Sequence, residues 1–392
     1  MNILFVYNTA ITSSQGGTER VTRCIANALQ QAGYSIFFMT IDASPSEEKN
    51  VHAPNHFLIK RHLDTETKIK QVRDICKQHR IKIIINEKGD FDNFSIFSNR
   101  VLPNIKIISC LHFDVMGRIK NGKRWISNNI FKRIIYSALL ALGIDLYRIK
   151  RHLNDRSRYR KMLEVSDAVV VVTPIIAKEL KQLTHIHPEK IISIYNPLSF
   201  TTMHPHYNEN AKEKIFLYVG RLAHEKNVDK LLKAWGKIAD SHSEWTLEIA
   251  GSGILQKDLE AIVINKKIPR VTFHGHVENI EELYNKAEYL CLPSSHESFS
   301  CVVLESMAYG CHPIVFDYPS APVVIPNARL GTRIKHSTRA LAKAMSTAIK
   351  NNTSNRHNID EISKHLAGFD INKLSNEWQL LLKRITRHHA TN

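Results

Sequence analysis

Two glutamates flank the start of a predicted helix in the stretch HESFSCVVLE, which runs from His296 to Glu305. Glu297 lies just before the helix and Glu305 about two turns along it, so they are roughly 10–12 Å apart. That separation is too long for two carboxylates acting on one glycosidic bond. It suits two carboxylates that hold hydroxyl groups at opposite ends of an elongated ligand. Ser298 or Ser300 is expected to cap the helix, and the helix N-terminus would face an anionic group.

A pair of cations precedes another predicted helix, in the stretch VGRLAHEKNVDKLL. Gly220 frees the turn after a strand, and Arg221 and Lys226 stand just before a helix that begins near Asn227. Because two cations at a helix N-terminus oppose the helix dipole, they weaken the helix unless an anion binds. A diphosphate would suit both, through a bidentate contact to Arg221 and a point charge at Lys226. The alternative is a basic loop that faces solvent.

Glycine turns follow several other predicted strands. Gly16 and Gly17 separate the first strand from the first helix, where backbone N–H groups could approach a ligand closely. Gly251 and Gly253 end the stretch WTLEIAGSG, and Gly275 interrupts VTFHGHV, so either turn could wall a nucleobase pocket. A di-glycine such as Gly16–Gly17 is more often only a turn, and each of the other two turns is equally consistent with ordinary turn chemistry. The first also departs from the G-x-G-x-x-G fingerprint of dinucleotide-binding folds.

Strands and helices alternate along the chain, which predicts an α/β fold with two doubly wound, Rossmann-like domains. The buried runs ILFVY, IKIIIN, IKIISC and DAVVVVT fit parallel strands of the first domain, and a second alternation begins near Lys214. We expect an N-terminal domain over residues 1–197 and a C-terminal domain over 198–370. A helix over 371–392 is expected to pack back on the first domain. Ligands of such folds bind at the carboxyl ends of the strands, here in a cleft that the two domains face.

Together these motifs resemble the retaining glycosyltransferases of family 4, the glycosyl transferases group 1, which have the GT-B fold. The resemblance covers almost the whole chain and is strongest from about 190 to 318. Its most specific part is the E-x7-E pattern of Glu297 and Glu305 together with the G-R-x4-K pattern that begins at Gly220. Both patterns stand at the positions where the family has them. The matching residues are Gly16 to Arg20, Asn196, Pro197, Gly220, Arg221, Lys226, Gly251, Gly253, Gly275, Glu297 and Glu305.

The resemblance implies a catalytic set and a donor-binding set. Arg221 and Lys226 would neutralise the donor diphosphate, Glu297 would bind hydroxyls of the donor sugar, and His112 would lie near that sugar. Glu305 would take the ribose hydroxyls of the nucleotide. The donor-binding set comprises Gly16, Gly17, Gly220, Gly251, Gly253, Gly275, Ser298, Phe299, Ser300 and Glu305.

Two positions depart from the family's pattern. Ser298 replaces the glycine that often follows the first glutamate. The stretch FDYPSAP (Phe316–Pro322) resembles a D-x-P-x-G-P segment of relatives that build surface polysaccharides, but Ala321 stands at its glycine. These substitutions affect the expected details of the donor pocket.

The sequence shows no obvious nucleophile for a double displacement. The resemblance implies front-face attack, with the protein supplying electrostatic support for the departing diphosphate. We expect no cofactor and no metal ion, and the donor substrate is expected to be a UDP- or GDP-sugar. The DFD stretch at Asp90–Asp92 mimics a metal-binding D-x-D motif but lies four residues past its strand. The six cysteines form no C-x-x-C pair, which disfavours a zinc site.

The net charge of +17 predicts an anionic partner. Residues 118–161 carry 13 Lys and Arg against 2 Asp, interleaved with apolar residues at helical spacing. This pattern suggests a basic amphipathic surface that docks on an anionic membrane, and an alternative is a helix pair with a solvated basic face. No segment is expected to cross a bilayer. We expect a cytoplasmic protein on the inner face of the cytoplasmic membrane.

The sequence thus predicts a retaining, metal-independent hexosyltransferase that uses a nucleotide-sugar. Its acceptor would be a lipid-linked glycan used in polysaccharide or lipopolysaccharide synthesis. One alternative is a GT-B-like sugar-nucleotide epimerase, which would hydrolyse donor without an acceptor. Another is a nucleic-acid-binding protein. Nucleic acid is not an expected partner, because the basic region lacks a recognised module and the donor motifs would be unexplained.

Overall fold

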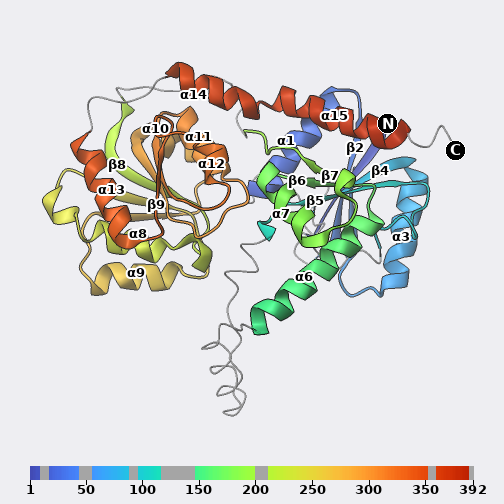
Figure 1. The fold of residues 1–392 in the computed structure, drawn as a ribbon, viewed down its shortest axis with the longest axis horizontal. Coiled ribbons are helices and arrows are strands. Elements are labelled where there is room, and N and C mark those ends of the chain that lie inside the picture. The colour runs from blue at the N-terminus through green and yellow to red at the C-terminus, as the bar shows by residue number, and fades with distance from the viewer. Residues whose placement is uncertain are drawn as a thin grey trace, which may run out of the picture. The chain divides into compact units, whose positions relative to one another are not determined.

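The computed structural model describes residues 1–8, 17–43, 55–87, 96–115, 146–198, 211–351 and 359–387. The chain divides into two compact units: unit 1 holds Met1–Tyr195 with Ser375–Asn392, and unit 2 holds Asn196–Leu374. Each unit contains one parallel sheet with helices packed around it (Figure 1). The α/β class and the two Rossmann-like sheets expected from the sequence are therefore confirmed.

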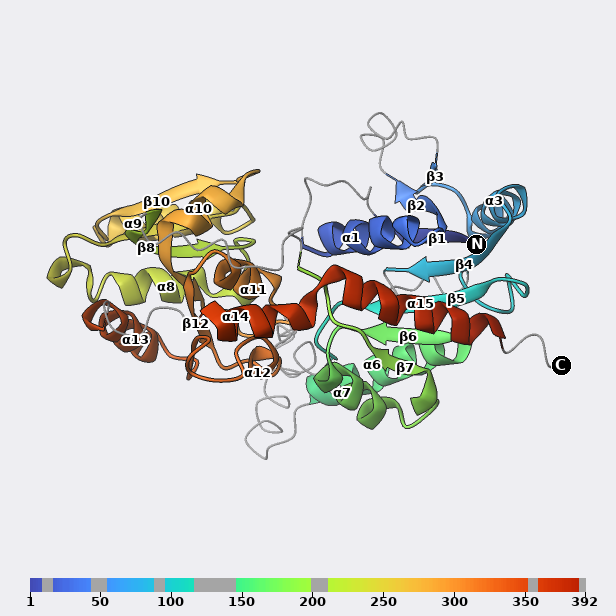
Figure 2. The same cartoon turned by 90° about the horizontal axis from the view of Figure 1, so that it is seen from above.

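The sheet of unit 1 has seven parallel strands in the order β3-β2-β1-β4-β5-β6-β7, as Figure 2 shows. Chain order reverses between β1 and β4, which are neighbours. The side chains of the central strands are almost all buried because helices cover both faces, so these strands are nearly continuous apolar runs. The strands are β1 (Asn2–Tyr7), β2 (Ser35–Ala43), β3 (His56–Lys60), β4 (Ile81–Asn86), β5 (Lys106–Leu111), β6 (Ala168–Val171) and β7 (Ile191–Ser193).

The helices of unit 1 begin and end at recognisable signals. Asp64 caps α3 by accepting the N–H of Thr67 at 2.9 Å, and Thr173 caps α7 ahead of a proline. Gly33 follows α1 with a φ of +89°, a conformation that favours glycine. The helices described in unit 1 are α1 (Gly17–Gln31), α3 (Thr65–Gln78), α6 (Leu146–Val165), α7 (Pro174–Thr184) and the short η2 (Pro188–Lys190).

The sheet of unit 2 has six parallel strands in the order β10-β9-β8-β11-β12-β13, so chain order reverses between β8 and β11. Phe216, Trp235 and Trp245 form an aromatic core beneath it, with the ring of Phe216 5.0 Å from that of Trp245. The strands are β8 (Glu213–Val219), β9 (Thr246–Ala250), β10 (Val271–Gly275), β11 (Ala287–Leu292), β12 (His312–Phe316) and β13 (Thr332–Ile334).

The helices of unit 2 lead into a long C-terminal helix, α15 (Ile371–Arg387), whose residues from Ser375 onward belong to unit 1. Its start agrees with the predicted helix, and residues 388–392 lie outside the described part. The other helices are α8 (Val228–Trp235), α9 (Gln256–Asn265), α10 (Ile280–Lys286), α11 (Cys301–Ala308), α12 (Ala321–Val324), α13 (Thr338–Lys350) and α14 (Ile359–Leu366), with short turns η4 (His224–Lys226), η5 (Ala239–Ser241) and η6 (Ala367–Phe369).

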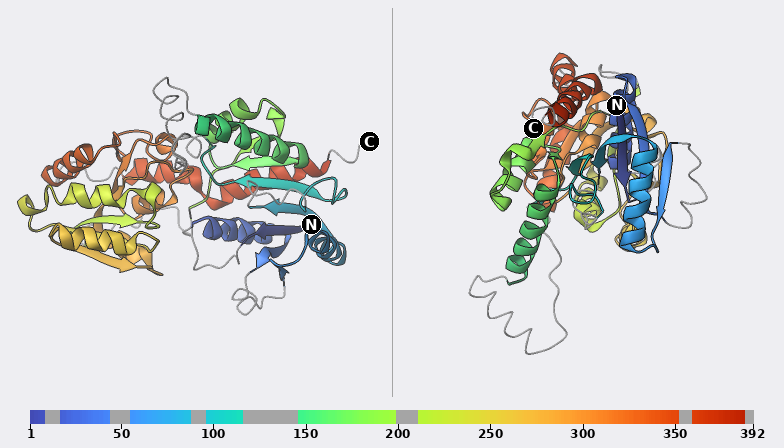
Figure 3. Two further views of the ribbon diagram at one scale, coloured as in Figure 1. Left: turned by 90° about the horizontal axis from the view of Figure 1, so that it is seen from below. Right: turned by 90° about the vertical axis from the view of Figure 1, so that its right-hand side faces the viewer.

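The basic region 118–161 is described only from residue 146 onward, where it forms most of α6. This helix projects beyond the sheet of unit 1 in Figures 1 and 3. One side of α6 is buried through Tyr159, Met162 and Leu163, whereas Ile149 and Leu153 are exposed one turn apart. Every helix in the described ranges is too short or too polar to span a bilayer.

Candidate active site

The predicted phosphate-binding and glutamate segments of unit 2 meet where its strand order reverses. Gly220 and Arg221 directly follow β8, and the segment up to Glu297 follows β11, the strand beside β8. Parallel α/β sheets bind ligands at the carboxyl ends of strands at such a reversal. The topology therefore brings together two segments that are about 70 residues apart in sequence.

Lys226 and Glu297 form an ion pair at this edge, with 2.6 Å between Nζ and Oε1. Both side chains are largely enclosed, at 17% and 13% exposure. The sequence placed both residues in the site but assigned them to different parts of the ligand. In this structure they contact each other, so an incoming diphosphate would share or displace the contact that Lys226 makes with Glu297.

Hydrogen bonds from neighbouring residues hold the two segments in register. The backbone N–H and the hydroxyl of Ser295 both donate to the carbonyl of Glu225, at 2.8 and 3.0 Å. Asn227, whose φ is +50°, donates from its side-chain amide to the carbonyl of Pro293 at 3.0 Å. These bonds fix the backbone on both sides of Lys226, which limits how far its ammonium group can move.

Arg221 is the accessible cation of the site. Its side chain is 72% exposed, and Nη2 lies 3.1 Å from Oε1 of Glu225, an exposed pair that adds little to stability. Its carbonyl accepts the hydroxyl proton of Tyr218 at 2.9 Å. Burial, followed by the charges of Glu297 and Glu225, raises the pKa of Tyr218 well above its usual value, so this phenol stays protonated. The backbone is thus anchored while the guanidinium remains open to a ligand.

Two of the predicted glycines, Gly251 and Gly253, let the strand-end loops pack tightly. A Cβ on Gly251 would lie 2.0 Å from the carbonyl oxygen of Gly220, and one on Gly253 would lie 2.4 Å from that of Leu222. Gly251 also has a φ of +136° and donates its N–H to the carbonyl of Gly275 at 2.6 Å. Only glycine fits at position 251 without moving backbone, so the glycines hold the loops after β8 and β9 close together.

Of the first glycine pair, Gly16 lies outside the described residues and Gly17 begins α1. The backbone around Gly17 has open space, since a Cβ placed there would meet nothing within 4 Å. The Asp90–Asp92 stretch also lies outside the described residues.

The segment before α11 is fixed by polar contacts other than a helix cap. Ser300 occupies the N-cap position, but its hydroxyl pairs with that of Tyr318 at 2.5 Å and makes no capping bond. The prediction that Ser298 or Ser300 caps the helix through its side chain is therefore wrong. The hydroxyl of Ser320 donates to the carbonyl of Glu297 at 2.6 Å, which orients the peptide there. Phe299 is buried, with its ring edge-on to that of Phe369.

Glu305 lies inside α11 and is only 4% exposed. The hydroxyl of Tyr284 donates to its Oε2 at 3.1 Å, which gives the carboxylate the partner that a buried charge requires. A ligand could reach Glu305 only through this small exposed part.

Unit 1 carries a second polar cluster at the carboxyl ends of β4 and β5, next to its own strand reversal. His112 follows β5 and lies 2.6 Å, from Nε2 to Oε2, from Glu87, which follows β4. Cys110 lies beside them, and each of the three offers one ligand atom within 4.8 Å of the others. The sequence reasoning found His112 but missed Glu87 and Cys110. An acidic residue directly after the buried run IKIIIN was the signal that could have revealed Glu87.

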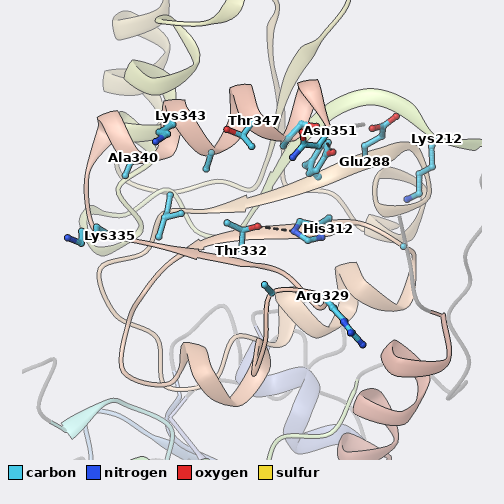
Figure 4. A pocket seen from close by; sticks show the side chains of 16 residues that line it. Lys212, Glu288, His312, Arg329, Thr332, Lys335, Ala340, Lys343, Thr347 and Asn351 are labelled. Carbon is cyan, nitrogen blue, oxygen red and sulfur yellow. Dashed lines mark hydrogen bonds between the residues drawn. The ribbon is translucent and has the colours of Figure 1, made fainter. Parts of the chain in front are cut away.

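A cavity of about 980 Å³ lies elsewhere in unit 2, beneath α13 at the amino ends of β11, β12 and β13 (Figure 4). His312 lines it and bonds to the hydroxyl of Thr332 at 3.0 Å. Lys212, at one end, donates to the carbonyls of Tyr284, Ala287 and Tyr309. None of the predicted site residues lines this cavity, and the loops after β8 and β11 lie at the opposite, carboxyl edge of the same sheet.

Two family models together match most of the chain. The model described as Glycosyltransferase Family 4 matches residues 15–200, and that described as Glycosyl transferases group 1 matches residues 199–366. Among curated relatives, an uncharacterized glycosyltransferase of Haemophilus influenzae is 26% identical over 94% of this chain and 97% of its own.

A second relative has a named activity. It is a GalNAc-alpha-(1->4)-GalNAc-alpha-(1->3)-diNAcBac-PP-undecaprenol alpha-1,4-N-acetyl-D-galactosaminyltransferase of Campylobacter jejuni, 28% identical over 79% of this chain and 92% of its own. Among solved structures, the sucrose-phosphate synthase of Thermosynechococcus elongatus superposes with a TM-score of 0.75 at 18% identity, covering 99% of both chains.

The two parallel sheets and these structural neighbours define a GT-B fold. The chain belongs to the glycosyltransferases of group 1, also called family 4. The resemblance carried by the E-x7-E and G-R-x4-K patterns is confirmed, and the chain is a glycosyltransferase.

Proposed function

We propose that this glycosyltransferase binds a UDP- or GDP-sugar at the loops after β8 and β11 and transfers the sugar with retention of configuration. The observation that carries the proposal is the enclosed Lys226–Glu297 pair beside the exposed Arg221 at the strand reversal. Two cations positioned there can stabilise negative charge as the nucleoside diphosphate departs. Glu297 can accept hydrogen bonds from sugar hydroxyls.

The same arrangement supports transfer without a metal ion or other cofactor. A divalent ion in such a reaction would neutralise the leaving diphosphate, and Arg221 with Lys226 can supply that charge from the protein. His112 would contact the donor sugar and Glu305 the ribose, as in the family resemblance. Activity that persists in EDTA is the expected result, and loss that Mg²⁺ or Mn²⁺ restores would contradict it.

The acceptor that we propose is a glycan on a lipid diphosphate, used in cell-surface polysaccharide or lipopolysaccharide synthesis. Support comes from the substrate of the Campylobacter relative and from a Salmonella typhimurium relative, a lipopolysaccharide 1,6-galactosyltransferase, which is 28% identical over 59% of this chain. The enzyme would work at the inner face of the cytoplasmic membrane.

The basic part of α6 provides a surface for that membrane. Arg156, Arg160 and Lys161 line a groove with Arg100, and the exposed Leu153 lies at the same groove. Cations beside exposed apolar side chains favour an anionic bilayer surface, where each basic residue near the surface contributes about 1 kcal/mol.

The direct test is a transfer assay with panels of nucleotide-sugars and diphospholipid-linked glycans. The expected result is nucleotide release that depends on both substrates. The new glycosidic linkage should have the same anomeric configuration as the donor sugar. Inversion of the anomeric centre would overturn retention. Donor hydrolysis that needs no acceptor would favour an epimerase-type reaction instead.

A further inference from the structure

The cavity of about 980 Å³ in unit 2 runs along β13, the edge strand of the sheet, with α13 above it (Figure 4). Ala340, Ala344 and Ala348 line it from successive turns of α13. Because an alanine side chain ends at its Cβ, this side of the helix leaves open the space that longer apolar side chains would fill. Ala340 and Asn351, which both line the cavity, are roughly 16 Å apart along the helix. The cavity is therefore elongated and has an apolar wall.

Hydrogen bonds within unit 2 fix the walls of this cavity. The hydroxyl of Tyr289 donates to the carbonyl of Ala348 at 2.9 Å, which ties β11 to α13. Nε2 of His312 lies 3.0 Å from the hydroxyl oxygen of Thr332, which links β12 to β13. At one end, the ammonium group of Lys212 donates to three carbonyls at 2.7–2.9 Å. The cavity is thus a built part of the fold, and its volume lies in the range of about 300–1,000 Å³ that is usual for small-molecule sites.

The residues that line the cavity carry an excess of positive charge. Four of them are Lys or Arg, and one, Glu288, is acidic. Burial lowers the pKa of His312 to about 4, so its ring is uncharged at neutral pH. The ammonium groups of Lys335 and Lys343 make no hydrogen bond or ion pair with any residue that the structure describes. Because a cleft lined by one sign of charge concentrates ligands of the opposite sign, the cavity favours an anion.

We propose that this cavity binds an elongated organic phosphate, with its apolar body along the alanines of α13 and its phosphate at Lys335 and Lys343. A phosphate monoester carries close to two negative charges at neutral pH and offers three acceptor oxygens, which match the two ammonium groups. Both an alkyl phosphate, as in a lipid, and an aromatic phosphate ester have this chemistry. The site lies within unit 2 and away from the loops after β8 and β11, so it does not rest on the proposed function.

Isothermal titration calorimetry of the full-length protein with hexyl phosphate and 1-naphthyl phosphate tests the ligand class. At least one ester should bind with a Kd of about 1 mM or lower, as expected for a ligand of this size. Hexanol lacks the charge and inorganic phosphate lacks the apolar body, so each should bind about tenfold more weakly. The ester that binds more tightly distinguishes a chain from a ring as the natural body. Failure of both esters to bind, or inorganic phosphate that binds as tightly as they do, would overturn the proposal.

Substitution of the two lysines tests where the phosphate lies. Lys335→Ala/Lys343→Ala should weaken ester binding by about tenfold or more, the effect of losing one hydrogen bond to a charged group. The matched control is Lys350→Ala/Lys364→Ala, which removes the same charge from residues that do not line the cavity. This control should bind the ester as the wild type does. Equal weakening in the two double variants would indicate general attraction to a basic surface and would contradict the site.

Filling the cavity tests the apolar wall. Leucine is a good helix former, so Ala344→Leu should fold with a melting temperature close to that of the wild type and should lose ester binding. Unchanged binding in Ala344→Leu would overturn the cavity as the site, and the lysine variants decide the question if Ala344→Leu folds poorly. Arg221→Ala, changed in the loop after β8, should still bind the ester. Loss of ester binding in Arg221→Ala would assign the phosphate to the proposed donor site and contradict a separate one.

Discussion

At the scale of single residues, the central contact is the ion pair between Lys226 and Glu297. Neither side chain is more than 17% exposed, so removing one partner leaves the other poorly solvated. The pair also fixes both groups before a ligand arrives. Preorganised charge of this kind stabilises a leaving group without rearrangement during the reaction.

Replacing Lys226 by alanine should lower kcat by about 10²- to 10³-fold, the loss typical of removing one positioned charge-stabilising donor. The measurement is initial-rate kinetics with a saturating nucleotide-sugar. The matched control is Lys233→Ala on α8, since Lys233 pairs with Asp229 at 2.8 Å but both side chains are exposed. Activity close to wild type is expected for this control. Equal losses in the two variants would show that Lys226 has no special role.

A pH effect is expected from His312 at the start of β12. Burial lowers its pKa to about 4, below the usual value of about 6.5 that it regains on unfolding. Between these values the unfolded chain binds the extra proton, so stability falls as pH drops from about 6.5 toward 4. In His312→Asn, the loss of unfolding free energy between pH 7 and pH 4.5 should be smaller than in the wild type by about 1–3 kcal/mol. Urea unfolding at pH 7 and pH 4.5 measures it.

The exposed His187, whose φ of +47° suits asparagine, gives the control substitution for this measurement. His187→Asn should keep the wild-type difference in stability between the two pH values. An unchanged difference in His312→Asn as well would mean that His312 is not the group responsible.

The sequence alone supplied the candidate site residues but not the contacts between them. Arg221 and Lys226 were predictable because two cations next to a helix start are locally unfavourable. Glu297 was predictable from its place before a helix start and its spacing from Glu305. The bond from Lys226 to Glu297 spans 71 residues and depends on two strands becoming neighbours. The hydroxyl of Ser300 likewise bonds Tyr318, which no local capping rule could foresee.

At the scale of elements, the loops after β8 and β9 interlock through their backbones. Gly220 donates to the carbonyl of Ala250 at 3.0 Å, and Leu222 to that of Ser252 at 2.9 Å. The strands themselves were predictable because buried parallel strands are short apolar runs. The interlocking was not, since a glycine turn in sequence gives no sign of which backbone approaches it.

Gly251→Ala should destabilise unit 2 by about 2 kcal/mol or more, because its methyl group would overlap the carbonyl of Gly220 and its φ is +136°. Thermal unfolding measures the change. Gly368→Ala is the control, since nothing lies within 4 Å of a Cβ placed there. A melting temperature for Gly251→Ala equal to that of Gly368→Ala would show that the two loops do not pack as described.

At the scale of the whole molecule, charge is the feature that the fold itself does not explain. The chain carries a net charge of +17, of which the described α6 contributes a row of Arg and Lys with exposed Ile149 and Leu153. A soluble donor requires no such surface. A lipid-linked acceptor does, because the enzyme must remain at the bilayer to meet it.

Co-sedimentation with liposomes should show binding to vesicles containing anionic lipid and little binding to neutral ones. Binding should fall as salt rises from 50 to about 500 mM, since screening weakens surface charge interactions. The triple variant Arg156→Glu/Arg160→Glu/Lys161→Glu should lose most of it. Lys257→Glu/Lys266→Glu/Lys267→Glu, around α9, changes the charge equally and should retain binding. Equal binding to neutral vesicles would contradict the membrane role.

The most direct test of the whole account is a thermal-shift panel of nucleotide-sugars on wild type, Arg221→Ala and Lys226→Ala. Arg221 is mostly exposed, so its substitution should leave the fold intact. One UDP- or GDP-sugar at 100 times its Kd should stabilise the wild type by about 2.7 kcal/mol, a rise of several degrees. Both variants should lose most of this rise, while Lys233→Ala keeps it. Stabilisation that survives in both variants would contradict a donor site at the loops after β8 and β11.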